Sequence, residues 1–264
     1  RLSAELGRRG VLTRTGVSLE AVESRAGSQG SGSGCWRLHL RSDRTEVLDA
    51  DGVVLAVPAG VAARLLAGRA AGAAGLLRTI EHASVAVLTM ALPAGAVGSP
   101  MDGTGFLVPR SSTVHGARPL VTATTYLGRK WPHLARPGDE LMRVSVGRFG
   151  DARHQSIDDG ELLEAILVEL AHLLGVKDRP IDWMVTRFDR AFPQYQVGHL
   201  IKVARIEQEV SALGGMEIAG AAYRGVGIPA CIGSGRDAAR RVLAFVAPSK
   251  APTPSPAPDE AGRS

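Results

Sequence analysis

The stretch GGMEIAGAAYRGVGIPACIGSGRDAARRVLAFV, residues 214–246, decides the fold class of this chain. Residues 216–223 predict a strand, residues 224–235 a glycine-rich turn, and residues 236–246 a short helix that Ser234 caps. Bare backbone N–H groups and the positive end of a helix favour an electron-rich ligand edge. The pattern therefore predicts an α/β fold with a ligand at this turn.

The turn also matches a relaxed dinucleotide pattern, because Gly225, Gly227 and Ala230 satisfy G-x-G-x-x-A. A true fingerprint opens a βαβ unit with an acidic residue about twenty positions further on, whereas here one helix runs into a proline-rich tail. We therefore reject the literal match. Gly225 and Gly227 still permit close backbone approach, and a flavin, whose pyrimidine carbonyl gains negative charge on reduction, suits such a site.

The amino-terminal part of the chain predicts further strands. Residues 11–17 and 35–40 are strand candidates, and the glycine and serine run between them, residues 24–34, lacks the Lys-Ser/Thr pair of a phosphate loop. We interpret that run as a long hairpin connection. Residues 53–57 predict a short strand that turns through Pro58 into a helix.

The middle of the chain has a different pattern, in which several strands precede one clear helix. The strand candidates are residues 84–92, 103–109, 120–127 and 141–147. The helix is predicted over residues 160–175, with Asp158 and Asp159 at its start and Gly175 at its end. Its apolar stripe consists of Leu163, Ile166, Leu167, Leu170, Leu173 and Leu174.

Residues 181–199 predict a strand that leads into an aromatic and proline turn, and a second helix follows. We place Ile201, Ile206, Val210 and Leu213 on one face of that helix. Residues 248–264 predict a disordered proline-rich tail.

Composition excludes several classes of protein. The 264 residues are 45% apolar and 22% charged with a net charge of +5, which is typical of a soluble globular protein. The cations are scattered among acids, so we expect no nucleic-acid partner. Cys35 and Cys231 have no paired spacing, so we expect neither a disulfide framework nor a metal site.

Nothing in the chain predicts a membrane span or export. The charge-free stretch 83–101 is interrupted by prolines and glycines, so we do not expect it to cross a membrane. The opening RLSAELGRRG lacks an apolar signal core. We expect a cytoplasmic location, and leave open peripheral contact with the inner face of the plasma membrane.

Several segments together resemble a known family. They are TRTGVSLEAVE, DGVVLAVPAGVAARLL, TYLGRKWPHLARPGDELMRVSVGRFGD, AFPQYQVGHLIKVARIE and the stretch from residue 214 onward. The combination is similar to the carboxyl-terminal part of the oxygen-dependent porphyrinogen oxidases, which are FAD enzymes of haem biosynthesis in the flavin amine oxidase superfamily. The resemblance extends over nearly all of residues 2–246.

The resemblance implies a mixed α/β chain in which an incomplete FAD/NAD(P)-binding-like domain is interleaved with a sheet-plus-helix substrate domain. The FAD-binding segments would be residues 1–62 and 189–247, and the porphyrinogen domain residues 63–188. Val17 would contact the adenine side of FAD through its backbone. The remaining implied cofactor contacts are Ala56, Val57 and Pro58 at a strand end, and Gly220, Val226, Gly227 and Ile228 along the flavin.

The family's amino-terminal strand–GxGxxG–helix unit, which holds the FAD pyrophosphate, has no counterpart in this sequence. We therefore expect the chain to correspond to the later half or more of such an enzyme, and to hold FAD poorly by itself. The alternative of an inactive remnant follows from the same feature.

The reaction implied by the resemblance is the six-electron oxidation of coproporphyrinogen III to coproporphyrin III, in three hydride transfers to flavin with oxygen as acceptor and peroxide as product. Protoporphyrinogen IX as substrate, or the reaction of another flavin amine oxidase superfamily enzyme, are the alternatives. No catalytic acid or base is identified from the sequence. Tyr195 and His199 are predicted to position a turn rather than to catalyse.

Propionate groups of the substrate need cationic partners, and six residues in the expected substrate domain are candidates. For each of them an ordinary solvated surface charge is the favoured interpretation, so we assign none of them as a propionate partner. They are Arg110, Arg118, Arg129, Lys130, Arg143 and Arg148.

Overall fold

The computed structural model describes residues 1–25, 36–99 and 102–247. The chain divides into two compact units, one formed by Arg1–Leu77 with Leu200–Ser264 and the other by Arg78–His199. The second unit is thus inserted into the first along the sequence. The expected division into FAD-binding and porphyrinogen domains stays a prediction, and its boundaries, 62/63 and 188/189, fall within a helix and a strand described below.

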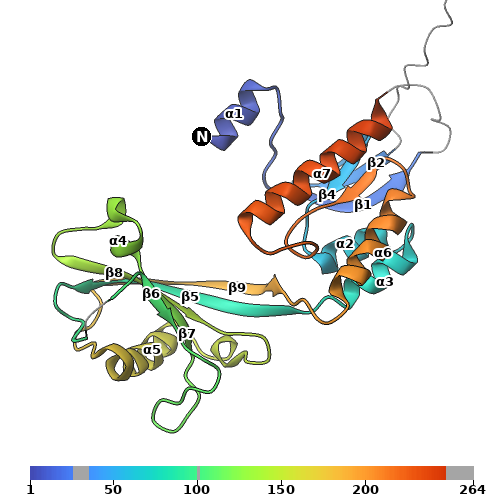
Figure 1. Ribbon diagram of the computed structural model, residues 1–264. Coiled ribbons are helices and arrows are strands. Elements are labelled where there is room, and N and C mark those ends of the chain that lie inside the picture. Colours follow the sequence, from blue (N-terminus) through green and yellow to red (C-terminus); the bar gives the residue numbers. More distant parts are fainter. Residues whose placement is uncertain (26–35, 100–101, 248–264) are drawn as a thin grey trace, which may run out of the picture. The chain divides into compact units, whose positions relative to one another are not determined.

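The first unit contains a two-stranded parallel sheet of β4 (Val53–Leu55) and β10 (Met216–Ile218), paired from Met216 to Val53 and from Ile218 to Leu55. Helix α7 (Ile228–Val246) packs on both strands (Figure 1). All three residues of β10 are buried, which is typical of a parallel strand enclosed by helices.

Three further helices belong mainly to this unit: α2 (Ala59–Leu66), α3 (Ala71–Arg78) and α6 (His199–Ser211). Helix α2 buries Ala62, Ala63 and Leu66. Glu209 of α6 accepts a hydrogen bond of 2.6 Å from the backbone N–H of Ala73, in the first turn of α3. A carboxylate at that position satisfies an orphan donor and complements the positive end of the helix.

A three-stranded antiparallel sheet completes the first unit. Its strands are β1 (Ser18–Ser24), β2 (Trp36–Arg41) and β3 (Thr45–Ala50), in that order. The indole Nε1 of the buried Trp36 donates to the carbonyl of Gly214 at 3.1 Å, just ahead of β10. Helix α1 (Leu2–Arg8) precedes this sheet and buries none of its residues.

The second unit is a five-stranded antiparallel sheet in the order β6-β7-β8-β5-β9, with helix α5 (Asp159–Leu174) along one side (Figure 1). Its strands are β5 (His82–Pro93), β6 (Gly105–Leu107), β7 (Val121–Tyr126), β8 (Asp139–Val146) and β9 (Asp182–Pro193). Short helices α4 (Leu127–Lys130), η1 (Pro132–Leu134) and η2 (Arg153–Gln155) connect them.

The core of the second unit lies between α5 and the sheet. Leu163, Ile166 and Leu170 of α5 are almost completely buried against Leu88 of β5 and Val144 of β8. Glu169 of α5 accepts hydrogen bonds from the backbone N–H groups of Leu120 and Val121, at 2.7 and 2.9 Å. The helix is therefore fixed to the sheet by apolar packing and by one carboxylate at the start of β7.

The sequence predictions for the second unit are confirmed. Each of the four strand candidates corresponds to one of β5–β8, and the predicted helix is α5. Asp158 and Glu161 form a reciprocal capping box, and Gly175 ends the helix in the left-handed conformation at φ 66°. The Asp158 and Gly175 assignments are correct, and Asp159 is the first helical residue.

For the first unit, three predictions are wrong and one strand is missed. Residues 11–17 are not a strand, because the chain turns at Gly16, whose φ is +70°, and β1 begins only at Ser18. Strand β3 was not expected. Ile201 is 71% exposed, and α6 instead buries Val203, Ile206 and Val210.

The third wrong prediction concerns α7, which begins at Ile228 instead of residue 236. Pro229 stands in its first turn, where a fixed φ and a missing N–H favour helix initiation. Gly233 and Gly235 therefore lie inside the helix, although glycine costs about 1 kcal/mol there relative to alanine. Packing of α7 on β4 and β10 overrides that local preference.

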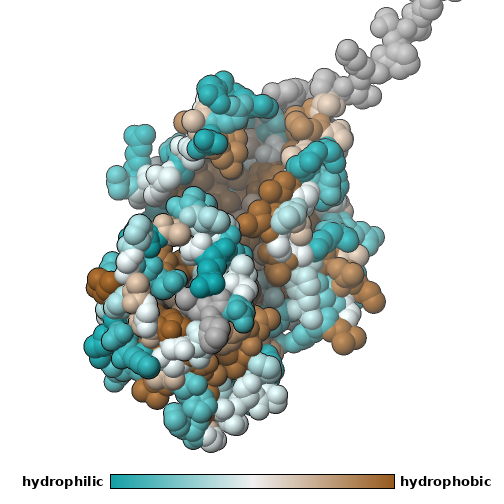
Figure 2. Space-filling view, turned by 60° about the vertical axis from the view of Figure 1, so that its left-hand side comes forward, coloured by the Kyte–Doolittle hydropathy of each residue, from teal (hydrophilic) through white to brown (hydrophobic). Residues whose placement is uncertain are grey.

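Strands β1 and β2 pair with each other, which confirms the hairpin. Its connection, residues 26–35 with Cys35, lies outside the described residues. The predicted tail, residues 248–264, also lies outside them. Apolar side chains also reach the surface among hydrophilic ones, as Figure 2 shows for one face. Within the described part of the chain, no helix is long and apolar enough to span a membrane.

Candidate functional site

The candidate site lies at the carboxyl edge of the parallel strands. Leu55 and Ile218 are paired at the ends of β4 and β10, and the Ala219 N–H donates to the Leu55 carbonyl at 3.1 Å. Because the strands are parallel, Ala56 and Gly220 leave the sheet at the same edge. This is the edge where ligands bind in open α/β sheets.

Gly220 is held in a conformation that requires glycine. Its φ is +126°, and its N–H donates to Ser234 Oγ of α7 at 3.2 Å. A Cβ built at Gly220 would meet no atom of the described residues within 4 Å. The strand end is thus fixed to α7 while the space beside its backbone stays open.

Gly225, just ahead of α7, is required both by its backbone conformation and by a close contact. Gly225 has φ +150°, and a Cβ there would meet the Ala230 Cβ at 2.6 Å. Gly227 is the N-cap, and its carbonyl accepts the first helical hydrogen bond from Cys231 N–H at 3.0 Å. The first N–H groups of a helix have no intrahelical partner, so this turn presents donors and a positive helix end.

Apolar side chains surround these donors. Val226, Ile228 and Ile232 are 49%, 77% and 58% exposed. In the described structure, Cβ atoms at Gly233 and Gly235 would also meet nothing within 4 Å. A flat aromatic ring with an electron-rich edge fits this combination of exposed apolar side chains, bare helix surface and backbone donors.

Seven of the eight residues expected to contact a cofactor fall in this region. Ala56, Val57 and Pro58 follow β4, Gly220 follows β10, and the others are at the start of α7. Val17, by contrast, is half-buried directly ahead of β1 in the three-stranded sheet region. Their contacts with a cofactor remain predictions.

The structural role of Ser234 differs from the predicted one. It was expected to cap a helix at 236, but it lies within α7 and accepts the Gly220 hydrogen bond. A small polar residue between two glycines is the only local signal, and it does not identify the distant donor.

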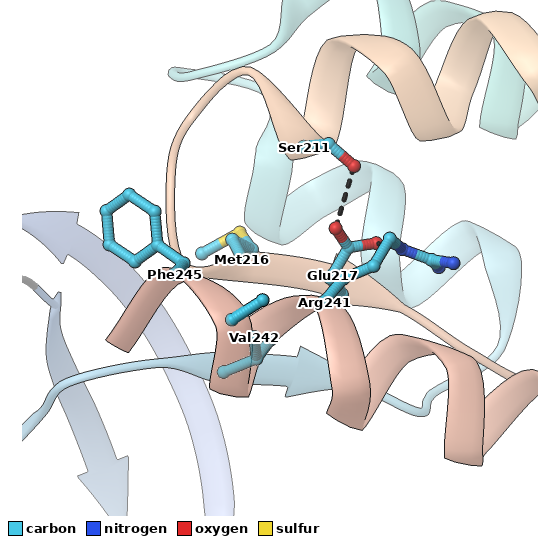
Figure 3. A pocket seen from close by; sticks show the side chains of 8 residues that line it. Ser211, Met216, Glu217, Arg241, Val242 and Phe245 are labelled. Carbon is cyan, nitrogen blue, oxygen red and sulfur yellow. Dashed lines mark hydrogen bonds and ion pairs between the residues drawn. The ribbon is translucent and has the colours of Figure 1, made fainter. Parts of the chain in front are cut away.

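A pocket of about 300 Å³ lies at the opposite, amino-terminal end of β10 (Figure 3). Glu217 is buried there, accepts a hydrogen bond from Ser211 Oγ at 2.7 Å and pairs with Arg241 Nε at 2.9 Å. Met216 and Phe245 add apolar surface. Since Oε1 accepts a hydrogen bond and Oε2 is in an ion pair, we interpret Glu217 as a structural group.

The titratable groups near the site do not suggest acid–base chemistry. Burial, together with the charge of Glu207, raises the pKa of the Tyr223 hydroxyl, which therefore stays neutral at physiological pH. Across residues 1–25, 36–99 and 102–247, no group of three His, Cys, Asp or Glu side chains could hold a metal ion.

In the second unit, Tyr195 and His199 lie at the end of the connection into α6. Their rings stack with centroids 3.9 Å apart at 13°, and His199 is buried. Gln194 N–H donates to the Glu81 carbonyl at 2.8 Å. This geometry supports a positioning role for Tyr195 and His199, which remains a prediction.

The six candidate propionate partners occupy dissimilar places. Arg110 donates to the Phe149 carbonyl at 3.4 Å, and Lys130 stands 4.9 Å from the centroid of the Trp131 ring. Arg118 lines a pocket with Asp151 and Arg153. The other three are Arg129 on α4, Arg143 in the middle of β8 and the partly buried Arg148 just after β8.

Comparison with known proteins gives a consistent result. The family model described as flavin containing amine oxidoreductase matches residues 1–243. This confirms the expected superfamily and the expected class of cofactor.

Individual relatives are named as porphyrinogen oxidases. Coproporphyrinogen III oxidase of Bacillus subtilis is 34% identical over 217 residues, which are 82% of this chain and 44% of that protein. Protoporphyrinogen oxidase of Bos taurus is 31% identical over 238 residues, covering 88% of this chain and 48% of that protein. The chain thus spans a little under half the length of these relatives.

A solved structure supports the fold. It is that of a protein assigned as a protoporphyrinogen oxidase from Exiguobacterium sp. 255-15, with a TM-score of 0.71 and 29% identity. The alignment covers 87% of this chain and 46% of that one.

Proposed function

This chain belongs to the family of flavin-containing amine oxidoreductases, and we propose that it serves the FAD- and oxygen-dependent oxidation of coproporphyrinogen III to coproporphyrin III. The observation that carries the proposal is the 34% identity with the Bacillus subtilis coproporphyrinogen III oxidase over 217 residues. Because the chain spans less than half of that relative, the activity, substrate and oxygen acceptor of the whole protein belong to the proposal. We also propose a cytoplasmic location.

The residues at the β4–β10 edge fit FAD. In the proposal, the backbone of Gly220 and Gly227 approaches the flavin, with Val226 and Ile228 as apolar contacts. Ala56, Val57 and Pro58 approach the cofactor from the end of β4, and Val17 contacts its adenine side through the backbone. The open space beside Gly220 and the exposed apolar side chains at the start of α7 support this assignment.

FAD, when bound, supplies the chemistry by accepting hydride from the substrate and passing the electrons to oxygen. The chain's own residues bind and orient. The backbone donors at the start of α7 hold the electron-rich edge, and the neighbouring aliphatic side chains exclude water from it. No side chain is assigned as an acid or base.

Protoporphyrinogen IX is the second candidate substrate, favoured by the 31% identity with the bovine protoporphyrinogen oxidase. It carries two vinyl groups where coproporphyrinogen III carries two more propionates. Turnover of both substrates by the same preparation distinguishes them, because a higher kcat/KM identifies the preferred one.

The experiment measures FAD binding and substrate turnover separately, on protein expressed from its whole reading frame. We expect FAD to bind at one equivalent and coproporphyrinogen III to be converted to fluorescent coproporphyrin III with consumption of oxygen. Gly220→Val should abolish FAD binding, because the side chain would be strained at φ +126° and would fill the open space.

The matched control is Gly75→Ala on α3, where a Cβ meets nothing within 4 Å of the described chain and φ is ordinary. It should retain FAD. Absence of FAD binding by the wild type would refute the cofactor assignment, and flavin without porphyrin formation would refute the reaction.

A further inference from the structure

The five-stranded sheet has two dissimilar faces. Leu88 and Val144 are paired across β5 and β8 and point into the core beneath α5. Side chains alternate along a strand, so their neighbours point the other way. We call the second side the open face and define it by the row Thr125, Arg143, Thr89 and Met184, which are paired in turn across four strands.

The open face combines apolar side chains with hydroxyl groups and carries few charges. An antiparallel sheet with one face on the core usually carries polar residues on the other. Here Val87 is paired with Ser145 and Ala91 with Leu141, on either side of the row. Leu107 is 80% and Met184 62% exposed. Exposed apolar side chains among uncharged hydroxyl groups suit the body of an amphipathic ligand.

Arg143 is the cation at the centre of this face. Its cross-strand neighbours, Thr125 and Thr89, are uncharged, and so are Leu141 and Ser145 on either side along β8. Within the described ranges, its side chain has neither an ion pair nor a hydrogen bond. Arg153 and Arg187 of the same unit, by contrast, pair with Asp151 and Asp159 at 2.7 Å each.

Asp139 and Asp182 share this face with Arg143, and neither is its cross-strand neighbour. Asp139 stands four residues ahead of Arg143 at the start of β8 and is paired with Pro93. Asp182 stands at the start of β9 and is paired with Ala91, so β5 separates it from β8. Its Oδ1 accepts a hydrogen bond of 2.8 Å from the Trp183 N–H. The guanidinium therefore remains available to an external anion.

We propose that Arg143 binds a carboxylate of an amphipathic acid whose apolar body lies on the open face. A guanidinium matches a carboxylate with two parallel N–H···O bonds, which fixes orientation as well as position. The inference rests on the proposed function, in which the acid is the porphyrinogen and the carboxylate one of its propionates. The inference selects Arg143 from the six candidate propionate partners because of the position of Arg143 in the sheet.

The experiment compares binding of two stable porphyrins by fluorescence titration of the whole protein with FAD bound. Coproporphyrin III carries free propionates, and its tetramethyl ester carries none. Arg143→Gln should weaken coproporphyrin III binding about 10-fold, the size expected for one charge-assisted contact, and should change ester binding less than about twofold. Arg143→Lys, which keeps the charge but not the fork, should recover part of the loss.

Arg179→Gln is the matched control, because it removes the same charge from the same unit. Arg179 pairs with Glu164 of α5, on the other side of the sheet. The affinity of the Arg179→Gln variant for both porphyrins should equal that of the wild type. Equal circular dichroism spectra of all variants exclude a folding defect.

Three outcomes overturn the inference and separate it from the proposed function. Unchanged affinity of Arg143→Gln for coproporphyrin III, with turnover intact, refutes the role of Arg143 alone. If Arg143→Gln weakens the binding of coproporphyrin III and of its tetramethyl ester equally, recognition of a carboxylate is refuted. Failure of the wild type to bind either porphyrin while it retains FAD refutes both the inference and the substrate assignment.

Discussion

The β4–β10 edge and the open face of the antiparallel sheet present different chemical groups, namely backbone groups at the edge and side chains on the face. At the edge, glycines and the start of α7 present backbone groups. Gly220 and Gly225 have positive φ, and a Cβ at Gly225 would also meet Ala230. On the open face, regular strands present side chains, and a single cation stands among neutral neighbours. A site made of backbone is sensitive to any added Cβ, whereas a site made of side chains is sensitive to their chemistry.

The largest effect is expected from the core that supports the open face. Ile166→Ala should lower the free energy of unfolding by about 4 kcal/mol, because it leaves a cavity between α5 and the sheet. Urea denaturation measures the loss. Val168→Ala on the same helix, 57% exposed, should stay within about 0.5 kcal/mol. A loss below about 1 kcal/mol for Ile166→Ala would contradict tight packing here.

Gly225→Ala tests the backbone-made edge directly. It should destabilise the first unit by about 3 kcal/mol, because alanine is strained at φ +150° and its Cβ would overlap Ala230. FAD affinity should fall with it. Thermal unfolding and FAD titration measure the two effects, with Gly75→Ala as the control. An unchanged FAD affinity would show that the start of α7 does not contact the cofactor.

Arg241→Met tests whether the first unit also depends on charge. Removal of the guanidinium leaves the buried Glu217 with Ser211 as its remaining hydrogen-bond partner, which should cost about 2 kcal/mol. The double variant Glu217→Gln with Arg241→Met should recover part of this loss, since the uncompensated charge is gone. If the double variant is as unstable as the single one, the charge is not the cause.

The smallest effect concerns pH and the second unit. Hydrogen bonds and charge from Arg153 lower the pKa of Asp151 from 3.8 to about 2. The pair therefore stabilises the fold fully above pH 3.8 and loses its contribution as pH falls through 2. Because Arg153 is half exposed, we expect about 1 kcal/mol.

Asp151→Asn should flatten the pH dependence of the unfolding free energy between pH 4 and 2. Asp237→Asn on α7, whose carboxylate is 58% exposed beside Arg240, should lower stability by less than about 0.5 kcal/mol. An Asp151→Asn variant with the wild-type acid profile would exclude Asp151 as the titrating group.

Sequence patterns predicted the second unit well because its elements are locally determined. The spacing of Leu163, Ile166 and Leu170, with Asp158 and Gly175 at the ends, defines α5 without reference to any other element. Runs of β-branched and apolar residues likewise predicted β5–β8. The pairing register is not local, so the row that places Arg143 between two threonines could not be predicted.

In the first unit, local preference and tertiary packing disagree. Glycines at 233 and 235 favour a turn, yet α7 continues through them because it packs on β4 and β10. Gly220 follows β10 and Gly227 precedes α7, and their contacts with a cofactor stay predictions. The hydrogen bond from Gly220 to Ser234 could not be predicted, since it depends on where the helix begins.

The insertion of one unit into the other has a consequence for the order of folding. Residues Arg78–His199 are continuous and contain all five strands of their sheet, so they can fold as soon as they leave the ribosome. Strand β4 must wait for β10, which is synthesised much later. Pairing of His82 with Pro193 brings the two ends of the inserted unit together. Its completion therefore shortens the loop that β4 and β10 must close, and lowers the entropic barrier to assembling the first unit.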